Sequence, residues 1–368
     1  HMHYGDDFTG PLLLSMGVTS VRDPGNRPDE SIARVRRIQS GALLGPRVIP
    51  MMLIDGPGPY AAQMAVTATD EASALAAVER AERDGFAGVK LYGSLKPELV
   101  PVIARRAHEL GLRVQGHVPA GMRPLDAVRA GYDEITHINF VMMQAAPPEV
   151  LAASNTTQRF YGPARFAADV DLNSPEMRAY LDELGRRRIA VDPTLAIFEN
   201  GFCENPGQVA AMYAPWMDAL PPAVRRGTLS GGFAPLADLP REHMCQSFGK
   251  LQALIPELNR RGVTLLAGTD GSGLELIRDL ELYVRAGLTP AEALATATIN
   301  PARAFGLERE TGSITVGKAA ELALIDGDPS RNISDIRQVE LVMRDGLLMR
   351  AADLRAAAGL GAGPKRGD

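Results

Sequence analysis

The 368-residue sequence has 45% hydrophobic residues and a formal net charge of −5, as expected for a globular protein with a large core. The charge gives no sign of nucleic-acid binding, because no basic run is longer than Arg186-Arg187-Arg188. No apolar run approaches the roughly 18 residues that a membrane-spanning helix needs. We therefore expect neither nucleic acid nor a membrane as a partner.

The chain opens on His1-Met2-His3, with no predicted strand before it. His-Met is also a frequent cloning remnant, but we interpret these residues as native because they fit a metal site shared with later residues of the chain. We expect a missing upstream segment, which could have carried a targeting signal.

Strand-like and helix-like segments alternate through the first part of the chain. Strands are predicted near residues 18–22, 47–54, 87–93, 113–119 and 134–140, and helices over residues 11–16, 31–39, 70–84, 97–110 and 124–130. Gly85, Gly111 and Gly131 mark helix ends. This alternation predicts an α/β fold with a parallel sheet.

The rhythm is then interrupted twice. Insertions are predicted over residues 140–170 and, as a Pro/Gly-rich lid, over residues 203–240; a helix from residue 175, a strand over 189–197, a helix over 242–261 and a strand over 263–267 complete the pattern. A capping box at Thr289 opens one more helix. Short strands at residues 313–316, 321–325 and 340–343 predict part of a small β-sandwich.

Three predicted strands each carry a residue that can take part in metal chemistry. Lys90 and His117 are 27 residues apart, and His117 and His137 are 20 apart. Either separation accommodates the helical crossover that parallel strands require. In a barrel of parallel strands the active groups gather at the C-terminal strand ends, so all three should meet at one rim.

Further candidate ligands lie at the two ends of this region. His1 and His3 would point to the same face of a strand, and imidazole and carboxylate groups such as Asp270 suit zinc. A buried lysine such as Lys90 can lose its proton. The neutral amine can then take up carbon dioxide to give a carbamate, whose two oxygens can bridge two ions.

Each candidate also has a structural interpretation. A single histidine at a strand end is more often structural, and Asp270 in Gly-Thr-Asp-Gly-Ser also has the chemistry of a helix N-cap. We interpret His108 and His243 as structural. Tyr92 and Thr194 follow strands and face either substrate or packing.

Two weaker candidates complete this set. Asp192 is a candidate for contacting a metal-binding side chain without binding the metal itself. Cys203 and Cys245 lack the setting of a nucleophile, and a single bridge between them stays open.

Five motifs in order, HMH, GVKLYG, QGHVP, ITHINF and AGTDG, resemble the amidohydrolase superfamily, in particular its imidazolonepropionase-like and Xaa-Pro-dipeptidase-like metal-dependent hydrolases. The ending also matches, with LTPAEALATATINPARAFGL followed by GSITVGKAAELALIDGDP. The resemblance implies a (β/α)8 TIM barrel over residues 1–311, part of a small β-sandwich over 312–350 and a tail over 351–368. The family's N-terminal strands, which precede its HxH motif, are absent from this sequence.

The resemblance also implies a binuclear metal centre. His1, His3 and Asp270 would hold one ion, and His117 and His137 would hold the second. Carboxylated Lys90 would bridge two divalent ions, expected to be zinc, with a hydroxide between them. Asp270 would also shuttle protons.

The implied activity is hydrolysis of an amide C–N bond in a small peptide or N-acyl amino acid. Lactone hydrolysis, deamination or decarboxylation on the same site, or a catalytically silent barrel that acts as an interaction protein, are the alternatives. Likeness to exported proteins favours the periplasm or secretion over the cytoplasm, and a homo-oligomer is compatible with the sequence.

Overall fold

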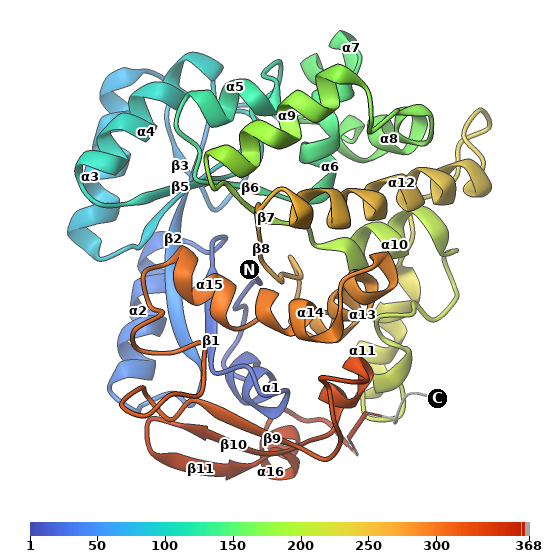
Figure 1. Cartoon of the computed structure of the whole chain (residues 1–368). Coiled ribbons are helices and arrows are strands. Elements are labelled where there is room, and N and C mark those ends of the chain that lie inside the picture. Colours follow the sequence, from blue (N-terminus) through green and yellow to red (C-terminus); the bar gives the residue numbers. More distant parts are fainter. Residues whose placement is uncertain (362, 365–368) are drawn as a thin grey trace.

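A computed structural model describes residues 1–361 and 363–364 of the chain (Figure 1). In this part of the chain the main sheet consists of β1 (Ser20–Asp23), β2 (Arg47–Asp55), β3 (Val66–Thr67), β4 (Gly88–Leu91), β5 (Arg113–Gly116), β6 (Glu134–Thr136), β7 (Ala190–Asp192) and β8 (Thr264–Leu265). The strands follow the order β1-β2-β4-β5-β6-β7-β8, and β3 pairs with β2. Every pairing in this sheet is parallel. The predicted TIM-barrel-like α/β fold is confirmed.

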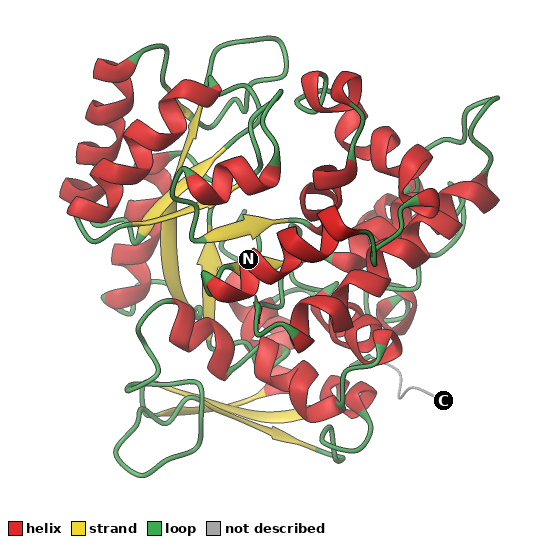
Figure 2. Ribbon diagram, turned by 45° about the horizontal axis from the view of Figure 1, so that its top comes forward, coloured by secondary structure: helices red, strands yellow, loops and turns green. Residues whose placement is uncertain are grey.

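The first three residues of the chain join the two edges of this sheet. Met2 N donates to Arg22 O at the end of β1, over 3.1 Å. On the other side, Thr269 N donates to His1 O and His3 N donates to Gly271 O, both beyond the end of β8. The N-terminus therefore lies among the strands, as both views show (Figure 1 and Figure 2).

Crossover helices connect successive strands, as the spacing predicted. They are α2 (Pro28–Gln39), α3 (Glu71–Asp84), α4 (Val100–Glu109), α5 (Pro124–Arg129), α9 (Pro175–Arg186) and α12 (Arg241–Arg260). Their ends carry the expected local signals: Asp70 and Ser73 form a capping box on α3, and Gly85 ends that helix with a φ of 88°. The apolar faces of α3, α4, α5, α9 and α12 pack with the strands in one large core, whereas Ile38 of α2 belongs to a second cluster with Val21 of β1 and Val48 of β2.

Further helices interrupt or follow this pattern. They are α6 (Ile138–Met142), α7 (Pro148–Ala152) and α8 (Gln158–Phe166) after β6; α10 (Leu195–Cys203) and α11 (Pro222–Gly227) after β7; and α13 (Leu276–Ala286), α14 (Pro290–Thr296) and α15 (Ile299–Ala304) after β8. Single turns of 3-10 helix lie at Pro97–Leu99, Met143–Ala145, Ala167–Asp169, Ala214–Trp216, Thr228–Ser230 and Ile333–Arg337.

The strand predicted over residues 189–197 is wrong in its second half. Only Ala190–Asp192 is a strand, and the helix α10 begins at Leu195. A short apolar run does not distinguish a buried strand from a buried helix. Here the first three residues of α10, Leu195, Ala196 and Ile197, are all apolar, and six of the nine residues of the helix are buried, so no polar face identified it.

A small antiparallel sheet follows the barrel, with strands β9 (Leu322–Ile325), β10 (Val339–Arg344) and β11 (Leu347–Arg350) in the order β11-β10-β9. Figure 2 shows it apart from the main sheet. Its core joins Val339 and Val342 with Leu14 of α1 (Thr9–Ser15) and with Ala351 and Leu354 of α16 (Ala351–Ala357).

Two details of this sheet differ from the prediction. Residues 313–316 are not a strand, and Ile314 and Val316 point into solvent. The strand β11 was not predicted. It returns from β10 through Asp345-Gly346, where both residues have positive φ, as a tight hairpin turn requires.

Cys203 at the end of α10 and Cys245 on α12 form a disulfide, with their Cα atoms 4.5 Å apart. It ties the helix that follows β7 to the crossover helix that precedes β8. Among the described residues, no helix combines the length and the apolar character needed to cross a membrane.

Candidate metal centre

The predicted ligands come together at the C-terminal ends of the barrel strands. Lys90 lies in β4, His117 directly follows β5, His137 directly follows β6, Asp270 follows β8, and His1 and His3 lie on the segment that joins the sheet edges. Since these strands are parallel, their C-terminal ends meet at one rim, where barrel active sites lie. The structure thus gathers six residues from five separate parts of the sequence.

Asp270 is the centre of this group. Its Oδ1 atom lies 3.1 Å from His1 Nε2 and 2.9 Å from His3 Nε2. Its Oδ2 atom lies 3.7 Å from His137 Nε2. Ligand atoms of His1, His137 and Asp270 all lie within 4.8 Å of one another. One carboxylate thus faces three imidazoles, an arrangement in which a shared cation would sit between them.

His117 completes the histidine cluster. Its ring centroid lies 4.8 Å from that of His137, and its other face stacks on Tyr92 at 3.9 Å. The Nδ1 atom of His117 is buried and has no hydrogen-bond partner among the described residues. A buried polar atom without a partner is rare in native structures and needs an explanation. A bound metal ion would supply one.

Lys90 is buried beside the same cluster. The Nζ atom lies 5.8 Å from the ring centroid of Tyr92, and no carboxylate of the described residues lies within ion-pair distance of it. Burial, reinforced by the charge of Arg22 and opposed by that of Asp270, lowers the pKa of the lysine. The environment therefore favours the neutral amine, as desolvation does for a buried lysine.

The imidazoles of the cluster are also driven toward neutrality. Burial lowers the pKa of His137 to about 3, and burial with the nearby His137 and Lys90 holds the pKa of His117 well below its ordinary value. A neutral imidazole has the free lone pair that metal coordination requires. This donor set of imidazoles and a carboxylate fits a divalent cation.

His1 differs because an acidic residue supports it from behind. Its Nδ1 atom and its amino group both lie 2.6 Å from Asp192 Oδ2 at the end of β7. Burial acts against protonation of His1, but the charge and hydrogen bond of Asp192 outweigh it and raise the pKa. A carboxylate on the far nitrogen fixes the ring of a metal-binding histidine and increases its basicity. This geometry matches the supporting role predicted for Asp192.

A buried ion network extends this support across the barrel interior. Arg22 on β1 donates to Asp192 Oδ2 at 2.9 Å and to Glu134 Oε2 at 2.7 Å on β6. Asp192 and Glu134 are fully buried. Arg22 and Glu134 were not predicted.

Replacing Arg22 should therefore destabilise the protein strongly. Arg22→Met leaves Asp192 and Glu134 as buried carboxylates without their shared cation, and breaking such a pair costs about 3–5 kcal/mol of unfolding free energy. Urea denaturation followed by circular dichroism measures this loss. Adding Glu134→Gln to this variant removes one of the two uncompensated carboxylates and should recover part of the lost unfolding free energy. A single variant as stable as the native protein would contradict the assigned role.

The backbone at this rim is held in an unusual conformation. His137, Thr194 and Asp270 have φ values of 73°, 48° and 52°, in the left-handed region that non-glycine residues seldom adopt. Such conformations persist where the surroundings enforce them, often at functional sites. Space is also restricted at Gly268, where a Cβ atom would lie 2.2 Å from Asp192 Oδ1 and 2.5 Å from the amino group of His1.

Thr194 and Tyr92 lie differently relative to these histidines. Thr194 is fully buried, and its Oγ1 atom lies 2.8 Å from His137 Nδ1, so its hydroxyl can hold that ring in place. Thr194 does not line the neighbouring cavity, whereas Tyr92 does. Contact of either residue with a substrate stays a prediction.

This cavity measures about 40 Å³ and is lined by Tyr92, His117, His137, Asn139, Phe140, Arg159, Phe160, Ile197, Phe198 and Asp270. Ligand pockets usually measure about 300–1,000 Å³, so this cavity is smaller than a typical ligand pocket. The predicted insertion over residues 140–170 contributes Phe140, Arg159 and Phe160 to this lining.

The predicted lid over residues 203–240 does not line this cavity directly. Its Phe233 packs behind Phe160, with centroids 4.7 Å apart. Trp216 of this segment is buried in a separate core cluster with Leu220 and Ile277.

His108 and His243, the histidines interpreted as structural, make contacts away from the candidate metal centre. A ring nitrogen of His108 lies 3.1 Å from Asp133 Oδ2, and one of His243 lies 2.7 Å from Arg165 O.

Comparisons with known proteins agree with this fold. The Amidohydrolase family model matches residues 235–349. Imidazolonepropionase of Sphingopyxis alaskensis is 26% identical over 265 residues, which cover 59% of this chain and 64% of that protein. 5'-Deoxyadenosine deaminase of Methanobrevibacter smithii is 35% identical over 114 residues, covering 29% of this chain and 23% of that protein. The chain thus spans less than two-thirds of the length of these curated relatives.

Solved structures extend the likeness of fold over nearly the whole chain. Bottromycin amidohydrolase superposes with a TM-score of 0.71 at 22% identity, covering 96% of this chain and 77% of that chain. A Xaa-Pro dipeptidase with bound methionine superposes with a TM-score of 0.63 at 19% identity, covering 93% and 77%. With the ordered motifs, the family match over residues 235–349 and the curated relatives support membership of the amidohydrolase superfamily, and the solved structures show the same fold.

Proposed function

We propose that the protein is a metal-dependent hydrolase that cleaves an amide C–N bond in a small peptide or N-acyl amino acid. The observation that carries the proposal is the contact of one carboxylate, Asp270, with the rings of His1, His3 and His137 at the rim of the barrel. A hydrolytic metal site needs such a set of nitrogen and oxygen donors at an accessible strand end.

In this proposal His1, His3 and Asp270 hold one divalent ion, and His117 and His137 hold a second. Zinc suits these donors. When bound, such ions lower the pKa of a water molecule toward about 7 and polarise the substrate carbonyl. Asp270 accepts the proton of the attacking water and returns it to the leaving nitrogen, as a general base and then a general acid.

Lys90 would bridge the two ions after reacting with carbon dioxide. The lone pair of neutral Nζ forms a bond to the carbon of carbon dioxide, and a proton is released from the nitrogen. The burial that lowers the lysine pKa supports this step, because only the unprotonated amine can react. The resulting carbamate offers two oxygens and a negative charge to the cluster.

An activity panel tests the proposal directly. Protein prepared with zinc should release free amino acid from dipeptides or N-acyl amino acids, lose this activity with a chelator and regain it with added metal. The same panel should include adenosine derivatives and lactones, because two curated relatives are named deaminases of related nucleosides. Ammonia release from a nucleoside without amide cleavage would favour deamination. Metal-loaded protein inactive on the whole panel would favour the silent interaction protein.

We also propose that the protein works in an oxidising compartment, such as the periplasm. The Cys203–Cys245 disulfide supports this, because disulfides persist mainly in exported proteins. Thiol titration of the denatured, unreduced protein should find no free cysteine. Two free thiols in protein taken from its native compartment would remove this support.

A further inference from the structure

Arg159 on α8 faces the cavity of the metal centre without a partner for its charge. It lines the cavity together with Tyr92, His117 and Asp270. Its Nε atom is buried without a hydrogen-bond partner, and no carboxylate of the described residues lies within ion-pair distance of its guanidinium. Burying a cation is costly unless an anion or hydrogen-bond acceptor compensates it. Arg159 is half-buried, and an anion in the cavity would supply a partner for its charge.

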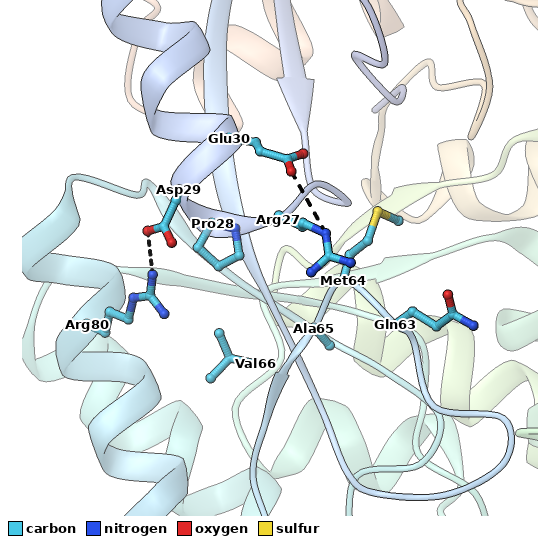
Figure 3. Close-up of a pocket in the computed structure, with 9 residues that line it drawn as sticks. All are labelled: Arg27, Pro28, Asp29, Glu30, Gln63, Met64, Ala65, Val66 and Arg80. Carbon is cyan, nitrogen blue, oxygen red and sulfur yellow. Dashed lines mark hydrogen bonds and ion pairs between the residues drawn. The ribbon is translucent and has the colours of Figure 1, made fainter.

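Arginines in a second hollow of the protein show the contrast. A hollow of about 300 Å³ lies between the start of α2 and the loop before β3 and is lined by two arginines, Arg27 and Arg80 (Figure 3). There Arg80 pairs with Asp29 at 2.7 Å, and Arg27 lies 3.9 Å from Glu30. These two cations are already compensated by the protein, whereas the cation beside the metal centre is not.

The surroundings of Arg159 hold it in place. Its guanidinium lies over the ring of Phe160, 4.8 Å from the centroid, and Asn139 Nδ2 donates to its backbone carbonyl at 2.8 Å. The positive charge of Arg159 acts on Tyr92. Burial raises the pKa of the Tyr92 hydroxyl, and the charge of Arg159 opposes this rise. The guanidinium is therefore a fixed positive charge next to the proposed reaction centre.

Other groups of the cavity complement such an anion site. Asn139 Oδ1 is buried, lines the cavity and has no partner among the described residues, so it offers an acceptor for an N–H group. Phe160 and Phe198 supply apolar surface, with their centroids 6.4 Å apart. A positive charge, an acceptor and aromatic rings in one cavity match the carboxylate, the amide N–H and an apolar side chain of an N-acylated α-amino acid.

We propose that Arg159 binds the free carboxylate of the substrate and so restricts the enzyme to dipeptides and N-acyl amino acids with a free carboxylate. This inference rests on the proposed hydrolase function and deepens it by naming the group that the site recognises. The planar guanidinium can form two parallel hydrogen bonds to a carboxylate, a geometry that lysine cannot reproduce. Substrates in which the carboxylate is amidated or esterified should bind weakly.

Binding of a non-hydrolysable probe tests this inference apart from catalysis. Calorimetry with 3-phenylpropanoate and its neutral analogue 3-phenylpropan-1-ol should show about 10- to 100-fold tighter binding of the carboxylate, as expected for a charge-assisted pair. Arg159→Met should abolish this difference, and Arg159→Lys should restore only part of it. Arg27→Met removes the same charge from the second hollow and should leave binding unchanged. Thermal unfolding checks that each variant is folded.

The outcomes separate this inference from the proposed function. If Arg159→Met binds 3-phenylpropanoate as tightly as the native protein, the carboxylate is held elsewhere and the inference is wrong, even if the protein cleaves N-acyl amino acids. If binding depends on Arg159 but the metal-loaded protein cleaves no amide, the anion site stands and the hydrolase function fails. If both hold, Arg159→Met should raise KM for N-acyl amino acids much more than for their amides.

Discussion

Asp270→Asn should lower kcat at least about a hundredfold, the lower end of the range for general acid–base catalysis. The amide has nearly the size of the carboxylate but cannot accept a proton from the attacking water. It also carries N–H donors where Asp270 Oδ1 now meets the ring nitrogens of His1 and His3. Steady-state kinetics on the best substrate of the activity panel, with metal content measured on the same sample, gives the result.

Asp126→Asn is a suitable control, because this aspartate is exposed on α5 and its ion pair among the described residues is with Arg129, at 4.0 Å. It should keep native turnover. If Asp270→Asn keeps both its metal and near-native kcat, another residue must accept the proton, and the role assigned to Asp270 is wrong.

Lys90→Ala should remove both metal and activity, with kcat/KM reduced at least about a hundredfold. Residues that only support metal ligands already cost about 10- to 100-fold when mutated, and a bridging ligand should cost no less. The side chain is almost fully buried in β4, between Leu53 on β2 and Gln115 on β5, so no surface group can take its place. The metal content and the kcat/KM of this variant should fall together.

A carbamate can be replaced chemically, which makes the test specific. Acetate or propionate added to Lys90→Ala should restore part of the metal binding and activity, whereas chloride should not. Lys96→Ala, an exposed lysine in the loop after the same strand, should behave as the native protein. Full metal content and turnover in Lys90→Ala would rule out a bridging role.

The sequence allowed the barrel and the meeting of its ligands to be predicted because both follow from local patterns. The separations of Lys90, His117 and His137 fit strand–helix–strand crossovers, and parallel strands bring their C-terminal ends together. Helix ends were likewise marked by glycines and by the Thr289 capping box, which the structure confirms.

Other features depend on the register of strands far apart in sequence. The bridge from Arg22 to Glu134 and Asp192 crosses the barrel interior, and no local pattern indicates which buried charges will meet. Thr194 follows a strand, as the proposed ligands do. Its backbone has a positive φ, and its hydroxyl contacts His137. Sequence position alone could not separate a group that contacts substrate from one that orients a ligand.

Metal analysis of the intact, purified protein tests the proposed binuclear centre most directly. After growth with zinc, mass spectrometry should find roughly two divalent ions per chain, as a binuclear centre requires. The double variant His117→Asn/His137→Asn should lose at least one of them, while His108→Asn, outside the site, should lose none. A folded native protein that binds no divalent ion, even when zinc is added, would contradict a metal-dependent function.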